Sequence, residues 1–113
     1  MGTNYYAVRN RPTTDEPIHI GKSSIGWKFH FQEQDSPYAE PPVEWHTYSQ
    51  VMAWLKRYTV DSKDYVIITE YDEIISLDEF IDLVAEKQKE NNPDDFYYAK
   101  NVDGYRFTEG WFE

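Results

Sequence analysis

Apolar and polar residues alternate with a period of two in the first third of the chain. The alternation runs through residues 18–20 and again through residues 27–31, and the segment between them, residues 21–26, is rich in glycine and serine. Successive side chains of a strand point to opposite faces of a sheet, and glycine and serine favour turns. The pattern therefore predicts a β-hairpin with its turn at residues 21–26, preceded by a short strand over residues 5–9.

Two segments carry the spacing of an amphipathic helix, and each begins with a capping box. The boxes are Thr47 with Gln50 and Ser76 with Glu79. The apolar residues after each box share one helical face: Tyr48, Val51, Met52 and Leu55 in the first helix, and Leu77, Phe80, Ile81 and Val84 in the second. We expect the second helix to end at the Asn-Asn-Pro sequence of residues 91–93.

The sequence between and before the helices predicts strands and loops. Residues 65–69 form a β-branched, apolar run typical of a buried strand, and an acidic turn at residues 70–73 leads to a short return strand at residues 74–75. Prolines in residues 10–17 and 35–44 favour irregular connections, because proline cannot donate to a sheet.

The end of the chain predicts a second hairpin, since Asp103-Gly104 suits a two-residue type I′ turn. This turn sets four cross-strand pairs: Val102 with Tyr105, Lys100 with Phe107, Tyr98 with Glu109, and Phe96 with Trp111. The order of elements indicates a single domain over residues 1–113. Its predicted class is α+β, with a largely antiparallel sheet of short strands and hairpins and two helices packed against it.

Composition limits the classes of protein to consider. The chain has 113 residues and no cysteine, which excludes disulfide scaffolds, thiolate metal sites and cysteine nucleophiles. Aromatic residues make up 18% of the chain, and their large buried areas favour a folded core over disorder. No apolar run is long enough to span a bilayer and the N-terminus lacks a secretory signal, so we expect a cytoplasmic protein without membrane contact.

The net charge of −10 is unevenly placed. Residues 1–57 hold six acidic and six basic residues, whereas residues 58–113 hold fifteen acidic and five basic residues. The acidic second half of the chain, residues 58–113, repels nucleic-acid phosphates, so we expect no direct binding to nucleic acid. It can instead attract a basic protein, although an acidic surface that serves only solubility is the simpler interpretation.

The segment Gly21-Lys22-Ser23 is similar to the end of a phosphate-binding loop, but Glu16 stands where the first glycine is needed. Its lysine and hydroxyls can still hold a small anion. If Ile20 pairs with Phe29, His19 and His30 lie side by side on adjacent strands. These residues define a candidate ligand site: His19, Lys22, Ser23, Trp27 and His30. The alternative is that both histidines simply face solvent.

The sequence contains none of the common motifs that indicate catalysis. No nucleophile elbow, metalloprotease motif, EF-hand loop or kinase signature occurs. Two histidines are half a metal site, and the third ligand, His46 or a distant carboxylate, cannot be placed from sequence. We therefore predict no enzymatic activity, no catalytic residue, no cofactor and no metal site.

Two N-terminal blocks, MGTNYY at residues 1–6 and HIGKSSIGWKF at residues 19–29, resemble a group of small uncharacterised proteins of bacteriophages and prophages. Residues 68–76 and 103–107 resemble later blocks of the same group. Some relatives carry a cysteine pair between the two N-terminal blocks, whereas residues 10–17 of this chain contain none. The resemblance implies a phage or mobile-element origin, hence the host cytoplasm, and brings no established activity.

Three hypotheses follow. The first is a non-enzymatic binding or inhibitor protein that docks on a basic host protein through its acidic half, with these contact residues: Glu70, Asp72, Glu73, Asp78 and Asp82. The second is a small-ligand or metal-binding domain built on the hairpin of residues 18–31. The third is a minor structural or assembly protein, or a homodimer, that uses the exposed aromatic side chains of Tyr38, Trp45 or Trp111. Sequence leaves the oligomeric state open.

Overall fold

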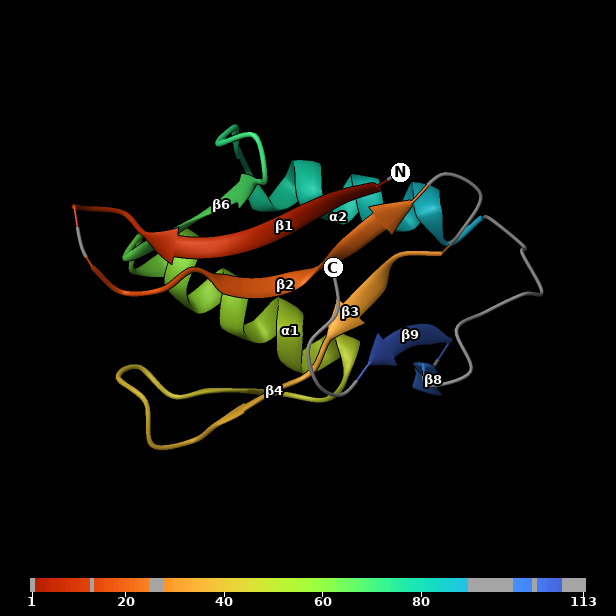
Figure 1. Cartoon of the computed structure of the whole chain (residues 1–113), viewed down its shortest axis with the longest axis horizontal. Helices are drawn as coiled ribbons and strands as arrows, with labels where there is room; N and C mark the ends of the chain where they lie inside the picture. Colours follow the sequence, from red (N-terminus) through yellow and green to blue (C-terminus); the bar gives the residue numbers. More distant parts are fainter. Residues whose placement is uncertain (1, 13, 25–27, 90–98, 103, 109–113) are drawn as a thin grey trace.

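The computed structural model describes residues 2–12, 14–24, 28–89, 99–102 and 104–108 (Figure 1). Within these described residues, one sheet contains seven strands: β1 (Gly2–Arg9), β2 (Ile18–Ser24), β3 (His30–Gln32), β6 (Tyr65–Thr69), β7 (Ile74–Ile75), β8 (Ala99–Val102) and β9 (Tyr105–Thr108). Their order is β7-β6-β1-β2-β3-β9-β8, and every neighbouring pair is antiparallel except β3 and β9. The predicted α+β class with a largely antiparallel sheet is confirmed.

Both helices cover the same face of this sheet (Figure 1). Helix α1 (Tyr48–Leu55) continues into the π-helical segment η1 (Lys56–Asp61), and α2 (Leu77–Lys87) follows β7. The core between the sheet and the helices is aromatic. Phe29 lies at the centre of it, with ring centroids 5.8 Å from Tyr5, 4.7 Å from Phe31 and 5.4 Å from Phe80. Among the described residues, no helix combines the length and the apolar character that crossing a membrane requires.

The capping prediction is confirmed in full at α2 and only in part at α1. Ser76 and Glu79 form the complete box on α2, with each side chain bonded to the other residue's backbone N–H. On α1 the Thr47 hydroxyl accepts from the Gln50 N–H, but the Gln50 side chain accepts from the backbone N–H of His46 rather than from Thr47. The predicted end of the second helix, at residues 91–93, lies outside the described residues.

Strand β2 corrects the first predicted hairpin. It runs through Ser24, so residues 21–24 are strand and not turn. Gly21 pairs with Tyr5 on one side and with Phe31 on the other, and Lys22 pairs with His30. The predicted pairing of Ile20 with Phe29 is therefore wrong. The reason is packing: glycine stands at this position because the Phe29 ring and the backbone of His30 occupy the space that a side chain would need.

The proline-rich segment also holds more structure than predicted. Strands β4 (Gln34–Ser36) and β5 (Val43–Trp45) pair as a separate two-stranded ribbon, with residues 37–42 between them. Trp45 is fully buried and its indole N–H donates to the Gln32 carbonyl at 2.6 Å, so the expectation that Trp45 is exposed is wrong. Tyr38 is 97% exposed, as expected, and Trp111 lies outside the described residues.

The start of α1 is joined to β9 by two stacked rings, and this pair makes stability sensitive to alkaline pH. Tyr48 and Tyr105 lie 4.0 Å apart with an interplanar angle of 4°. Burial raises the pKa of Tyr48 above its ordinary value of 10, and the neighbouring Tyr105 raises it further. The unfolded chain therefore loses this proton before the folded chain does, and the stabilising contribution present below pH 10 is lost as the pH rises beyond it.

We expect the free energy of unfolding to fall between about pH 9 and about pH 11, and Tyr48→Phe to make that fall shallower because phenylalanine has no proton to lose. Urea unfolding over this pH range measures it. Tyr71→Phe is the matched control, since Tyr71 is 65% exposed. Equal slopes in the two variants would show that Tyr48 does not contribute.

Candidate acidic docking surface

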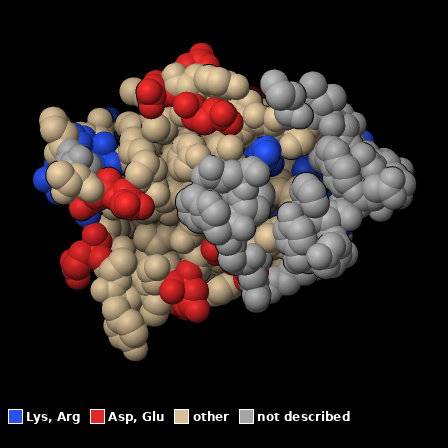
Figure 2. All heavy atoms as spheres, in the orientation of Figure 1, with Lys and Arg blue, Asp and Glu red and all other residues tan. Residues whose placement is uncertain are grey.

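The predicted partner-binding residues gather at one edge of the molecule. We call Glu70, Asp72, Glu73, Asp78 and Asp82 the acidic surface; all five are exposed. The first three lie on the turn from β6 to β7, and the last two lie on α2. In Figure 2 acidic side chains form a group along the upper edge, where Figure 1 places this turn and α2. From Glu70 to Glu86 the sequence holds seven acidic residues and no basic one.

Thr69 fixes the conformation of the turn. Its hydroxyl accepts hydrogen bonds from the backbone N–H groups of Tyr71 and Glu73, and its backbone bonds to Glu73 and Asp72. Asp72 has φ 64°, a left-handed conformation that aspartate tolerates better than most residues. The carboxylates of this turn are therefore held on an ordered backbone.

Glu70 has a structural role that the sequence did not reveal. Its carboxylate accepts from the backbone N–H of Asn4 at 2.7 Å and from the Asn4 side chain at 3.3 Å, which ties the turn to β1. A partner would have to compete with these bonds. Asp72, Glu73, Asp78 and Asp82 are consequently the better candidates for contact.

An apolar groove lies beside the acidic surface, between η1, the β6–β7 pair and the start of α2. Its volume is about 510 Å³, and Val60, Val66, Ile74, Ile75 and Leu77 supply its apolar lining. Val60 and Ile74 are 45% and 70% exposed. Strand β7 pairs with β6 only at residues 67 and 68, so the first two residues of β6 have a described neighbour strand, β1, on one side only.

The residues of the predicted ligand site do not converge. A bulge between β1 and β2 sets His19 opposite Tyr6 but Gly21 opposite Tyr5, so His19, Lys22 and His30 share the sheet face without helices. Ser23 lies on the opposite face with Gly21, and Trp27 lies outside the described residues. His19 and His30 are not cross-strand partners, and neither faces solvent: they are 1% and 4% exposed. Both expectations are corrected: β2 pairs with β3 through Gly21 with Phe31 and Lys22 with His30, which separates the two histidines along the sheet, and both rings are buried.

Buried His19 instead links three strands. Its Nε2 lies 2.9 Å from the Asn4 side-chain oxygen, and its Nδ1 lies 3.4 Å from the Gln32 side-chain oxygen. The two amide groups are oriented by their own donors, since Asn4 donates to Glu70 and Gln32 donates to the Thr108 carbonyl. His19 therefore has a structural role, in which it connects β1, β2 and β3, and its ring is not presented to an external ligand.

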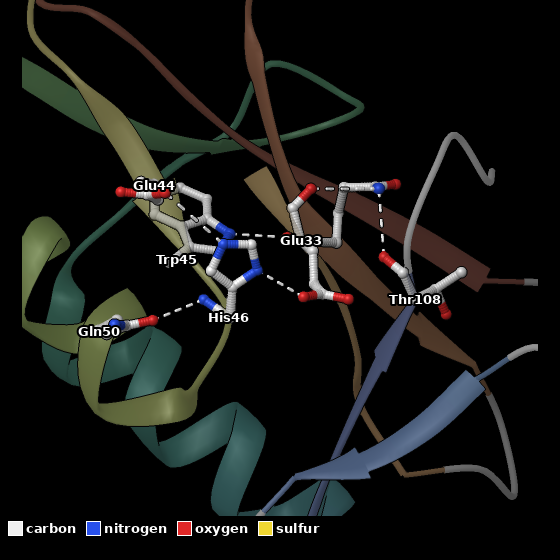
Figure 3. Close-up of polar contacts among 7 residues, drawn as sticks. Glu33, Glu44, Trp45, His46, Gln50 and Thr108 are labelled. Atoms are coloured by element: carbon white, nitrogen blue, oxygen red, sulfur yellow. Dashed lines mark hydrogen bonds and ion pairs between the residues drawn. The ribbon is translucent and has the colours of Figure 1, made fainter. Parts of the chain in front are cut away.

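A second constellation escaped the sequence analysis (Figure 3). His46 lies between Glu33 and Glu44: its Nδ1 is 2.5 Å from Glu33 Oε1, and its Nε2 is 3.9 Å from Glu44 Oε2. Ligand-type atoms of Asp35, Glu44 and His46 all lie within 4.8 Å of one another. The sequence contained one indication of this cluster: Glu33 and Asp35, and likewise Glu44 and His46, are two positions apart, as residues on one face of a strand are. The prolines between the two pairs favoured a loop instead.

The comparisons add no family to this description. No protein-family model, curated protein or solved structure matches the chain. The two constellations that the structure assembles, the acidic surface with its groove and the carboxylates around His46, are therefore the observations from which a function can be inferred.

Proposed function

We propose that this chain is a non-enzymatic binding protein whose acidic surface docks on a basic surface of a partner protein. The observation that carries the proposal is the run of seven acidic residues without a basic one from Glu70 to Glu86, displayed on an ordered turn and the exposed side of a helix. Complementary charge speeds encounter and selects partners.

The apolar groove offers a binding place for an apolar anchor residue, which charge attraction alone does not provide. Protein interfaces gain most of their affinity from a few apolar or aromatic anchors, while charged residues around them set specificity. Tyr71 and Ile74 are 65% and 70% exposed within the acidic run, and Ile74 also lines the groove. The matching partner surface carries lysine or arginine around a protruding apolar side chain.

The resemblance to phage and prophage proteins, given by the blocks at residues 1–6 and 19–29, suggests that the partner is a bacterial host protein. A host enzyme or defence factor that binds nucleic acid offers a cationic groove of the required sign. Occupation of that groove by the acidic surface would exclude nucleic acid, and the chain would act as an inhibitor.

The test uses two charge-matched double variants. Glu73→Lys with Asp82→Lys changes the acidic surface by four charges and leaves Glu70 and the first turn of α2 intact. Glu16→Lys with Glu40→Lys makes the same change at two exposed positions elsewhere. The immobilised wild-type chain is used to capture a partner from bacterial lysate, and the Kd of the purified partner is then measured at low and at raised salt.

We expect the acidic-surface variant to bind about ten-fold more weakly or worse and to lose most of the salt dependence, while the control stays within about two-fold of wild type. Equal loss in both variants would mean that only net charge matters. Capture of no basic protein, or of one that binds both variants as it binds wild type, would overturn the proposal.

A further inference from the structure

We propose that Asp35, Glu44 and His46 form a binding site for a divalent transition-metal ion, with Glu33 as the residue that orients the imidazole. This site is separate from the acidic surface, on the β4–β5 ribbon. The proposal rests on strand register, charge and burial.

The register brings the four side chains to one face of the ribbon. Asp35 is the cross-strand partner of Glu44. Glu33 and His46 lie one residue beyond the ends of the two strands, and their side chains are in contact. Residues at i and i+2 of a strand share a face, so these four residues form two stacked pairs. The opposite face carries Val43 and Trp45, which are buried in the core. The ribbon is therefore held by its apolar face, and its other face presents the ligands.

The charge of this arrangement calls for a cation. Three carboxyl groups, those of Glu33, Asp35 and Glu44, surround one imidazole, so acidic groups outnumber the basic group by three to one. Asp35 and Glu44 stand directly opposite each other, a pairing of like charges that destabilises an antiparallel ribbon. Each strand of the ribbon has only three residues, and an isolated two-stranded ribbon is marginally stable. A bound cation would turn this repulsion into a cross-strand link.

The buried carboxylate of Glu33 also supports a metal site. Its side chain is only 5% exposed, yet its carboxylate contacts His46 Nδ1 and so directs Nε2 toward Glu44 (Figure 3). A carboxylate on the far nitrogen is the usual companion of a metal-ligating histidine, because it fixes the ring and raises its basicity. The backbone N–H of Glu33 donates to the Thr108 carbonyl at 3.0 Å, which anchors this residue to β9.

The ligand set selects the class of ion. One imidazole with two carboxylates suits ions from manganese to zinc better than magnesium or calcium, which prefer oxygen alone. Such an ion lies about 2.1 Å from each ligand, which places neighbouring ligand atoms roughly 3–4 Å apart. The three groups are already within 4.8 Å, so side-chain rotation closes the site. Glu44 and His46 are 50% and 42% exposed, which leaves room for water to complete the coordination.

Zinc is the probe for the test, with magnesium as the comparison ion, and the protein carries no histidine tag. Calorimetric titration and thermal unfolding are measured for the wild type, for Asp35→Asn with Glu44→Gln, and for the control Glu16→Gln with Glu40→Gln. The site variant removes the like-charge pair, so we expect it to fold without metal at least as well as wild type. NMR of the three histidine rings reports which imidazole responds.

We expect zinc to raise the Tm of the wild type and the control, to shift the His46 ring signals, and to bind the site variant at least ten-fold more weakly; magnesium should do none of these at equal concentration. In the same assay Glu33→Gln should weaken zinc binding about 10- to 100-fold. No binding of zinc to the wild type, or unchanged binding to the site variant, would overturn the assignment.

Discussion

Replacing Phe31 with alanine is expected to lower the free energy of unfolding by about 3–5 kcal/mol, because the change removes a large buried ring and leaves a cavity. Phe31 has no exposed surface. Its ring centroid lies 4.7 Å from that of Phe29 and 5.0 Å from that of Phe107, with further ring contacts to Tyr48 and Tyr105. It therefore joins β3 to the central core, to α1 and to β9 at once.

Urea unfolding followed by tryptophan fluorescence measures this loss. A domain of this size has a total stability of about 5–15 kcal/mol, so the variant will be close to its unfolding limit. Tyr38→Ala is the control, since the ring of Tyr38 is 97% exposed, and it should change stability by no more than about 0.5 kcal/mol. A loss below about 1 kcal/mol for Phe31→Ala would contradict the packing of β3 against β9.

Sequence reasoning succeeded where local signals determine structure. The capping serine and threonine, followed by apolar residues on one face, located α1 and α2 to within a residue at their starts. The Asp103-Gly104 turn set a register that the structure repeats for Lys100 with Phe107 and Val102 with Tyr105. The other two predicted pairs, Tyr98 with Glu109 and Phe96 with Trp111, involve residues that the structure does not describe. Each correct element depends on contacts within a few residues of the chain.

Non-local pairing could not be predicted. The parallel pairing of β3 with β9 joins residues 30–32 to residues 106–108, and no local pattern encodes a contact across such a separation. The β1–β2 bulge is equally silent in the sequence, yet it decides on which face His19 lies. The paired-histidine hypothesis was wrong because Lys22, not His19, pairs with His30. Its solvent-facing alternative was wrong because Asn4 and Gln32, from two other strands, contact His19 in the interior.

The candidate sites differ in the same way, because one is local in the sequence and the other depends on non-local pairing. The acidic surface could be predicted because its residues follow one another along the chain, so charge counting alone finds them. The cluster around His46 could not be predicted, because Glu33 and His46 are thirteen positions apart and come together only when the β4–β5 ribbon forms. Three prolines in this segment favoured a loop over a ribbon. Glu70 lies between these cases: its exposure was correctly anticipated, whereas its bonds to Asn4 required the structure.

The second large effect is expected at Gly21, where alanine should lower the free energy of unfolding by about 3 kcal/mol or more. A Cβ atom built on Gly21 would lie far inside contact distance of two groups, 2.2 Å from the His30 carbonyl oxygen and 2.4 Å from the Phe29 ring. The nearest group is backbone of the paired strand, so no change of rotamer relieves the clash. Strands β2 and β3 would have to separate, with loss of the pairs at Gly21 and Lys22.

Gly104→Ala separates this steric effect from conformational strain. Gly104 has φ +88° and open space around the added atom, so alanine there meets only an unfavourable backbone conformation, with an expected loss of about 1 kcal/mol. Urea unfolding of the two variants compares the effects directly. Gly21→Ala should also weaken amide protection in β3, whereas Gly104→Ala should leave it unchanged. If the two variants lost equal stability, the close approach of β3 to Gly21 would not be the reason that glycine occupies the middle of this strand.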